Sequence, residues 1–143
     1  MKVEVKICED ITETYAVIYT NRMSEDISRI IEQFNFARDI ITASKDEKTV
    51  ILRPDDIYMI RVESEKVVIY DKNSNYKCGR RLYELEGQLG SGFLRISKSV
   101  LVNLRYLESI EPSFSGMLVV LKNGCKDYVS RKYLPNLKKY LGI

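Results

Sequence analysis

The sequence predicts a mainly β fold with short helices, α+β overall, preceded by a small N-terminal strand–strand–helix subdomain. Short runs rich in β-branched and aromatic residues recur between Thr49 and Tyr70, and turn-forming residues separate them. Two further strand-like runs flank Asn123-Gly124, the dipeptide that most strongly indicates a short hairpin. Apolar residues at helical spacing are confined to a few short segments. These observations together indicate that β-structure dominates the chain.

The opening of the chain is expected to form two strands. Val3, Val5 and Ile7 alternate with polar residues in the stretch from Met1 to Ile7, which predicts a strand with one apolar face. A second β-rich run extends from Tyr15 to Thr20.

A helix is expected to begin at Ser24. The Ser24 hydroxyl can cap the first turn, and the carboxylates of Glu25 and Asp26 suit its positive end. Its apolar face consists of Ile27, Ile30, Ile31 and Phe34. The polar stretch from Thr42 to Val50 is expected to be a connection, so we place a domain boundary near residue 44.

Residues 45–143 are expected to form a second, mostly β domain. Its first strands are predicted at Thr49 to Leu52, Ile57 to Val62 and Lys66 to Tyr70. A helix of one or two turns follows, with apolar spacing at Leu82, Leu85 and Leu89 and glycines after it. The chain closes with a short helix that has Pro135 in its first turn. The residues of this helix expected to face inward are Leu134, Leu137 and Leu141.

The composition argues against an enzyme. Histidine is absent, which removes the commonest general base and the commonest transition-metal ligand. The three cysteines, Cys8, Cys78 and Cys125, are far apart and form no CxxC pair, so neither a disulfide framework nor a zinc ribbon is indicated. We therefore expect no catalytic residues, no metal and no cofactor. No window approaches membrane-spanning length, and we expect a cytoplasmic protein without membrane insertion.

The charge is distributed unevenly along the chain. Residues 1–44 contain 5 basic and 8 acidic residues, whereas residues 45–143 contain 18 basic and 12 acidic ones. Beyond Tyr76 there are 12 basic against 5 acidic residues. This asymmetry indicates that the C-terminal part binds a polyanion, although a mixed solvated surface is the simpler alternative.

Basic residues occur at or near the ends of predicted elements in three places. These are Lys66, then Arg95 with Lys98, and finally Arg131 with Lys132. Basic side chains on the loops of a rigid β scaffold can reach phosphates and base edges. For any one of them, flanking a strand for solubility is the simpler explanation.

Four blocks follow one another in the second part of the chain: DDIYMIRVESEKVVIY, RRLYELEGQL, FLRISKSVLVNLRYLESIEPSFSGMLVVLKNG and YVSRKYLPNLKKYLG. In this order they resemble the LytTR DNA-binding domain of bacterial transcriptional regulators. The resemblance covers about residues 45–143. It implies an elongated, mainly β fold whose loops enter successive major grooves of DNA, an exception to recognition by a helix.

The resemblance also implies which residues contact DNA. The expected contacts are Lys66, Arg95, Ser97, Lys98, Ser99, Arg131 and Lys132. Ser97 stands where many members have histidine, which alters any contact made there. Lys66 is matched more loosely, because the loop before Val67 varies in length across the family. Asn103 also lies in the matched block, and both a buried hydrogen-bonding role and a DNA contact remain open for it.

We therefore expect a sequence-specific DNA-binding transcriptional regulator that reads the major groove through loop-borne basic and polar residues. Its expected partner is double-stranded DNA, as promoter direct repeats or paired half-sites. Residues 1–44 are too few for a receiver domain, so we expect them to form a homodimer interface, to cover a sheet edge or to bind a partner. The alternative is a non-catalytic protein-interaction module whose basic face binds an acidic protein partner.

Overall fold

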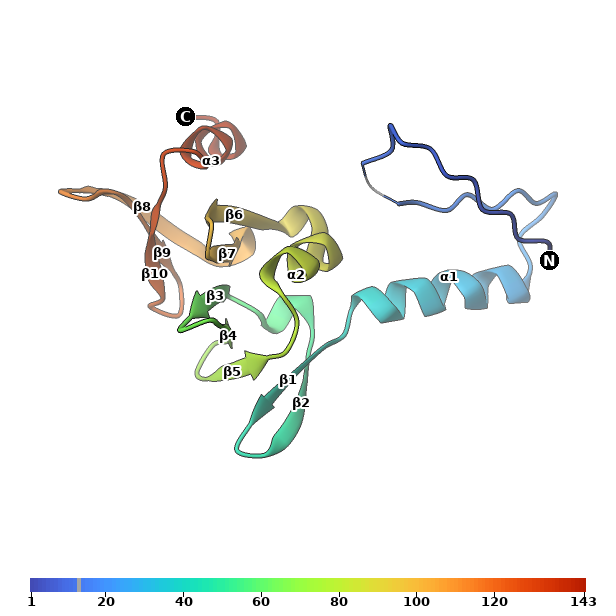
Figure 1. Ribbon diagram of the computed structural model, residues 1–143, viewed down its shortest axis with the longest axis horizontal. Coiled ribbons are helices and arrows are strands. Elements are labelled where there is room, and N and C mark those ends of the chain that lie inside the picture. Colours follow the sequence, from blue (N-terminus) through green and yellow to red (C-terminus); the bar gives the residue numbers. More distant parts are fainter. Residues whose placement is uncertain (13) are drawn as a thin grey trace.

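A computed structural model describes residues 1–12 and 14–143, apart from the side chains of residues 35–38 (Figure 1). Its helices are α1 (Glu25–Arg38), α2 (Leu82–Leu89) and α3 (Leu134–Leu141). Its strands are β1 (Ile41–Lys45), β2 (Lys48–Leu52), β3 (Met59–Glu63), β4 (Lys66–Tyr70), β5 (Asn75–Cys78), β6 (Phe93–Ser97), β7 (Val100–Asn103), β8 (Leu107–Ser113), β9 (Gly116–Leu121) and β10 (Lys126–Val129). The predicted mainly β fold with short helices is confirmed.

The strands form two antiparallel sheets. The larger has seven strands in the order β2-β1-β5-β4-β3-β7-β6, and the smaller has three in the order β10-β9-β8. Figure 1 shows the smaller sheet and α3 beside the β6–β7 end of the larger sheet, with α2 over the larger sheet and α1 extending away from both. The domain is therefore elongated along the direction from α1 to β8.

Two apolar clusters hold these layers together, one on each face of the larger sheet. Successive side chains of the central strands point to opposite faces, so each of these strands contributes residues to both clusters. In β3, Ile60 points into a cluster with α2, and its neighbour Met59 points into a cluster with the small sheet and α3. In β7, Leu101 joins the first cluster and Val102 the second. All four side chains are fully buried. These central strands are apolar on both faces because both faces of the sheet are covered.

Several predicted elements are confirmed in detail. Ser24 caps α1, since its Oγ accepts a hydrogen bond from the Ile27 amide at 3.4 Å and its carbonyl accepts one from the Ser28 amide at 3.0 Å. The hairpin at Asn123-Gly124 connects β9 and β10, with Gly124 at φ 90°. The predicted apolar face of α3 is also inward, with Leu137 buried and Leu134 and Leu141 half-buried.

The two strands predicted in the first 24 residues are wrong for the single chain. Met1 to Ile7 and Tyr15 to Thr20 carry no strand among the described residues. The side chains of Val3, Val5 and Ile7 are 78%, 85% and 93% exposed. A strand needs a partner for its backbone groups and a surface for its apolar face, and this chain provides neither here.

The polar connection predicted from Thr42 to Val50 is also wrong, because this stretch forms most of the β1–β2 hairpin. Ile41 and Ala43 are buried, and the polar residues that alternate with them face outward. The hairpin turns at Asp46 and Glu47, which adopt φ of 51° and 64° without a glycine. The predicted boundary near residue 44 therefore falls inside β1.

Asn103 is a buried hydrogen-bonding residue, which decides between the two roles left open for it. Its side chain is 4% exposed, and its Nδ2 donates to the carbonyls of Ile57 at 2.8 Å and Pro54 at 3.3 Å. Its Oδ1 accepts a hydrogen bond from the Arg105 amide at 3.1 Å. Asn103 thus ties the end of β7 to the segment that precedes β3.

Neither a membrane-spanning helix nor a metal-binding cluster is found among residues 1–12 and 14–143. No described helix is long and apolar enough to cross a membrane. The same residues contain no group of three or more carboxylate, thiol or imidazole side chains arranged to bind a metal.

We predict that Asn103→Ala lowers the free energy of unfolding by about 1–3 kcal/mol, because the buried carbonyl of Ile57 loses the hydrogen bond that Asn103 donates to it. Urea denaturation followed by circular dichroism measures this change. Asn75→Ala, at an exposed position in β5, is the matched control and should stay within about 0.5 kcal/mol of the wild type. Equal stability of the two variants would contradict the assignment.

Candidate nucleic-acid interface

Three loops with basic residues lie together at one end of the two sheets. They are the β3–β4 turn with Lys66, the β6–β7 turn, and the loop between β10 and α3. The Val62 amide of β3 donates to the Ser99 carbonyl at 2.8 Å, and the Ser130 amide donates to the Ile96 carbonyl at 2.9 Å. Each hydrogen bond joins one of the loops to the end of the strand that leads into another, Val62 of β3 in the first case and Ile96 of β6 in the second. We call residues 64–66, 97–99 and 130–132 the basic edge.

The β6–β7 turn is internally ordered. The strand pairing shifts register between Arg95 and Ser97, a bulge that re-aims the side chains at the end of β6. The Ser97 hydroxyl accepts a hydrogen bond from the Ser99 amide at 3.2 Å and lies 3.4 Å from the Ser99 hydroxyl. Both serines are half-buried, whereas Lys98 between them is exposed. The turn therefore presents Lys98 to solvent and uses the serines partly to hold its own shape.

Arg95 folds back onto this turn. Its Nε donates to the Ser97 carbonyl at 3.1 Å, and its Nη2 donates to the Lys98 carbonyl at 2.5 Å. Its Nη1 forms an ion pair with the Glu86 carboxylate of α2 at 3.3 Å, and the Arg95 side chain is only 20% exposed. The guanidinium is thus engaged in holding the turn, and its predicted contact with DNA stays a prediction.

The remaining predicted residues are open to solvent. Lys66 begins β4 opposite Glu63, and Arg131 and Lys132 follow β10. All three basic side chains are exposed. Lys132 Nζ lies 5.6 Å from the centre of the Tyr133 ring. The structure therefore places Lys66, Lys98 and the pair at residues 131–132 on neighbouring turns, and their contact with DNA stays a prediction.

The sequence analysis missed the cluster around Arg61 directly behind this edge. Arg61 donates from Nε to Glu63 at 2.8 Å, from Nη2 to the Tyr70 hydroxyl at 3.0 Å, and from Nη1 to Asp127 of β10 at 3.2 Å. The Tyr70 hydroxyl also donates to Glu63. The cluster links the two sheets. The only sign of this cluster in the sequence is that Arg61 lies in a run of apolar residues. Sequence spacing alone does not show that Arg61 pairs with residue 127.

The environment of Tyr70 changes its acidity. Burial raises the pKa of the Tyr70 phenol above its ordinary value, and the hydrogen bond to Glu63 raises it further, while Arg61 opposes the shift. The neutral phenol is therefore favoured in the folded state.

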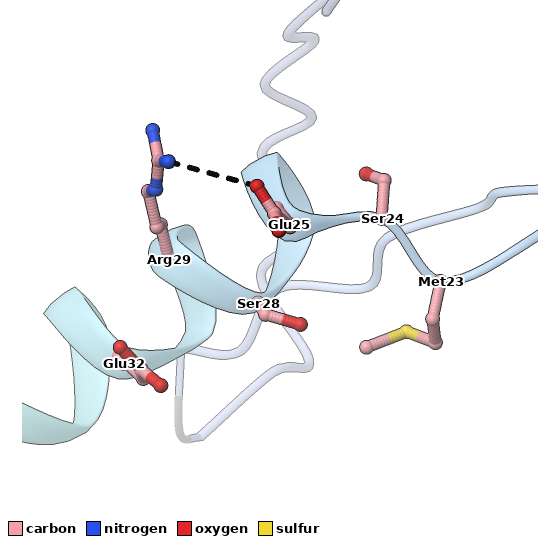
Figure 2. Close-up of a pocket in the computed structure, with 6 residues that line it drawn as sticks. All are labelled: Met23, Ser24, Glu25, Ser28, Arg29 and Glu32. Atoms are coloured by element: carbon pink, nitrogen blue, oxygen red, sulfur yellow. Dashed lines mark ion pairs between the residues drawn. The ribbon is translucent and has the colours of Figure 1, made fainter.

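Two concavities lie outside the basic edge. One of about 400 Å³ borders the start of α1, and Figure 2 shows the Glu25–Arg29 ion pair, 3.9 Å long, on its rim. The other, of about 680 Å³, is lined mainly by residues 86–91 at the end of α2. Both are open to solvent, and the exposed carboxylate and guanidinium on the first are what a solvated helix surface presents.

The comparison with family models defines the class, a DNA-binding domain. The model of the LytTr DNA-binding domain family matches residues 47–142. Among solved structures, the LytTr DNA-binding domain of a methyl-accepting/DNA response regulator from Bacillus cereus matches with a TM-score of 0.68 and 21% identity, covering 73% of this chain and 98% of that domain. This chain belongs to the LytTr DNA-binding domain family.

Relatives also match over the whole chain. Proteins of Staphylococcus aureus strains NCTC 8325 / PS 47 and COL, both named uncharacterized HTH-type transcriptional regulators, are 32% identical over 146 residues. These matches span 100% of this chain and 99% of each relative. Strands separate α1, α2 and α3, so the part of this chain that the structure describes contains no helix–turn–helix pair. Of the basic residues of the edge, Lys98, Arg131 and Lys132 lie in turns and Lys66 is the first residue of β4.

We predict that the stability of the wild type falls as the pH rises above about 10, the ordinary pKa of tyrosine. The unfolded phenol of Tyr70 ionises there while the folded one keeps its proton, so alkaline pH favours unfolding. The stability that the protonated Tyr70 phenol contributes is fully present below that pH. It is lost as the pH rises through the pKa that Tyr70 has in the folded state. Urea denaturation at several pH values between 8 and 11 measures the free energy of unfolding. This free energy should decline less with pH for Tyr70→Phe than for the wild type. Parallel curves for the two proteins would contradict this role.

Proposed function

We propose that this protein is a sequence-specific transcriptional regulator that binds double-stranded DNA through its basic edge, without catalysis. The observation that carries the proposal is the backbone connection of the three loops, through the Val62–Ser99 and Ser130–Ile96 hydrogen bonds. These connections set the spacing of the exposed cations before DNA arrives. The family membership and the names of the full-length relatives support the same function.

The chemistry of the edge suits a duplex. A major groove about 12 Å wide admits protein loops as well as a helix. The exposed Arg131 can donate two parallel hydrogen bonds to a guanine edge, and Lys66 and Lys98 can each neutralise a phosphate. The hydroxyls of Ser97 and Ser99 lie beside Lys98 and can add contacts to phosphates or single base acceptors. Lys132 extends the positive surface next to Arg131.

Arg95 acts in this proposal chiefly as a positioning residue. It bonds the carbonyls of Ser97 and Lys98, and Glu86 holds the guanidinium from α2. A turn held in its bound shape loses less conformational entropy when it binds. The contact of Arg95 with DNA predicted from the sequence then uses the second hydrogens of Nη1 and Nη2, since the first ones are donated to Glu86 and to the Lys98 carbonyl.

A homodimer fits this function. Regulators that read direct repeats or paired half-sites gain affinity when two DNA-binding domains are linked, because the second contact becomes intramolecular. Within residues 1–44, the part before β1 provides the proposed link, since its exposed apolar side chains are not covered by the β domain. A cytoplasmic location follows from the proposed action on DNA in a bacterium.

We predict that Lys98→Ala and Arg131→Ala weaken DNA binding without changing thermal stability. A duplex is first selected from a random library on the immobilised protein, and fluorescence anisotropy then measures affinity at several salt concentrations. Wild-type affinity should lie in the range of about 10⁻⁸ to 10⁻¹¹ M. Lys98→Ala should reduce the slope of log affinity against log salt by about 0.9, and Arg131→Ala should relax discrimination at one base pair by about 1–3 kcal/mol.

Lys48→Ala is the matched control, because Lys48 is exposed on β2, the edge strand farthest from β6 in the sheet order. It should bind as the wild type does. If selection enriches no sequence and all duplexes bind equally, the proposed function fails, and the basic edge is better explained as a surface for an acidic protein partner.

We predict that Glu86→Gln lowers affinity for the selected duplex roughly fivefold, because a charge-assisted hydrogen bond to Arg95 is worth about 1 kcal/mol or more. The salt slope should stay unchanged, since no phosphate contact is removed. Glu84→Gln is the control on the same helix, where Glu84 pairs with Arg80 at 3.6 Å instead of with the turn. An equal effect of both variants would contradict the positioning role.

A further inference from the structure

The largest set of exposed apolar side chains outside the β domain lies in the N-terminal segment. Its members include Val3, Val5, Ile7, Tyr15, Val17, Tyr19 and Met23, and Phe34 of α1 is 63% exposed. Exposed large apolar side chains concentrated in one segment often mark a site of protein association. Within this set, residues 3–7 have the alternation of a strand but no partner strand in the described part of the chain.

We propose that residues 3–7 pair with the same residues of a second copy as an antiparallel strand pair centred on Val5. The proposal rests on the homodimer of the proposed function and specifies its interface. In this register Val5 faces Val5, and Val3 faces Ile7 on both sides of the two-fold axis. On the other face, Glu4 of each copy lies opposite Lys6 of its partner copy. Apolar residues thus meet apolar ones, and opposite charges meet twice.

The neighbouring registers are less favourable. Centring the pair on Glu4 places Glu4 opposite Glu4 and Lys2 opposite Lys6. Centring it on Lys6 places two lysines opposite each other. Like charges directly opposite one another are destabilising, and a shift by one residue would turn the apolar residues to opposite faces. A pair centred on Val3 would also set Lys2 opposite Glu4, but it includes only residues 1–5, whereas the Val5-centred pair includes residues 3–7 and can extend in both directions. The order Lys-Val-Glu-Val-Lys-Ile therefore favours the Val5-centred pair over the registers centred on Glu4 and Lys6, and the greater length favours it over the one centred on Val3.

The single chain is arranged for this pairing. Lys2 Nζ lies 2.9 Å from the Glu4 carboxylate, which places these two alternate side chains on one side of the segment. Val5 and Ile7 remain 85% and 93% exposed and available to a partner. Figure 1 shows this segment and α1 on the opposite side of the molecule from the β3–β4 and β6–β7 turns. Two copies joined here would keep both basic edges free.

Charge exchange provides the test. Glu4→Lys and Lys6→Glu should each raise the dimer dissociation constant by roughly tenfold, since each places two pairs of like charges opposite one another. The double variant Glu4→Lys with Lys6→Glu restores both opposite-charge pairs and should dimerise as the wild type does. Sedimentation equilibrium of the full chain measures all four proteins. Because these side chains are exposed, thermal unfolding midpoints should not change.

Disulfide cross-linking tests the register. In a Cys8→Ser background, Val5→Cys should form a covalent dimer with oxidised glutathione, because the two Val5 side chains face each other across the axis. Val3→Cys, which faces Ile7, should not. The inference is overturned if the wild type is monomeric, if the charge exchange fails to restore dimerisation, or if Val3→Cys cross-links as well as Val5→Cys. None of these outcomes concerns DNA binding, which the anisotropy experiment tests separately.

Discussion

The half-buried guanidinium of Arg61 is the contact on which the arrangement of the basic edge depends. It joins Glu63, at the base of the β3–β4 turn, to Asp127 of β10, which leads into the loop with Arg131. Removing the cation would leave the carboxylates of Glu63 and Asp127 near each other without a counter-charge, which is unfavourable although both are partly exposed to solvent. The two sheets therefore keep their relative position through an ionic contact as well as through the apolar cluster beneath it.

This arrangement divides the basic residues of the edge into two groups. Arg61 and Arg95 are half-buried and use their donors on carboxylates and carbonyls of the protein. Lys66, Lys98 and Arg131 are exposed, and no ion pair holds them to another described residue. The first group shapes the loops and the second supplies charge for the proposed contact with DNA. A rigid scaffold with free cations at its loop tips lowers the entropy lost on binding.

Much of the fold could be predicted from local patterns, because elements such as β4 and α2 carry their own signals of periodicity and turn residues. The β1–β2 hairpin could not, since its turn at Asp46-Glu47 lacks the usual Asn-Gly and its outward face is polar. The pairing of Arg61 with Asp127 also escaped prediction, because 66 residues separate them and only the packing of the two sheets brings them together. The residues of the basic edge could be named through the family resemblance, but whether a side chain is free or engaged, as for Arg95, depends on that packing.

The most direct test of the account is an amide NMR titration of the full chain with the selected duplex. If the three loops bind DNA as one surface, the largest chemical-shift changes fall on residues 64–66, 97–99 and 130–132 at once, in one binding event with one midpoint. Amides of the β1–β2 hairpin, at residues 41–52, should stay unchanged. Changes confined to one loop, or centred on α1 or the β1–β2 hairpin, would contradict the claim that the three loops bind DNA as one surface.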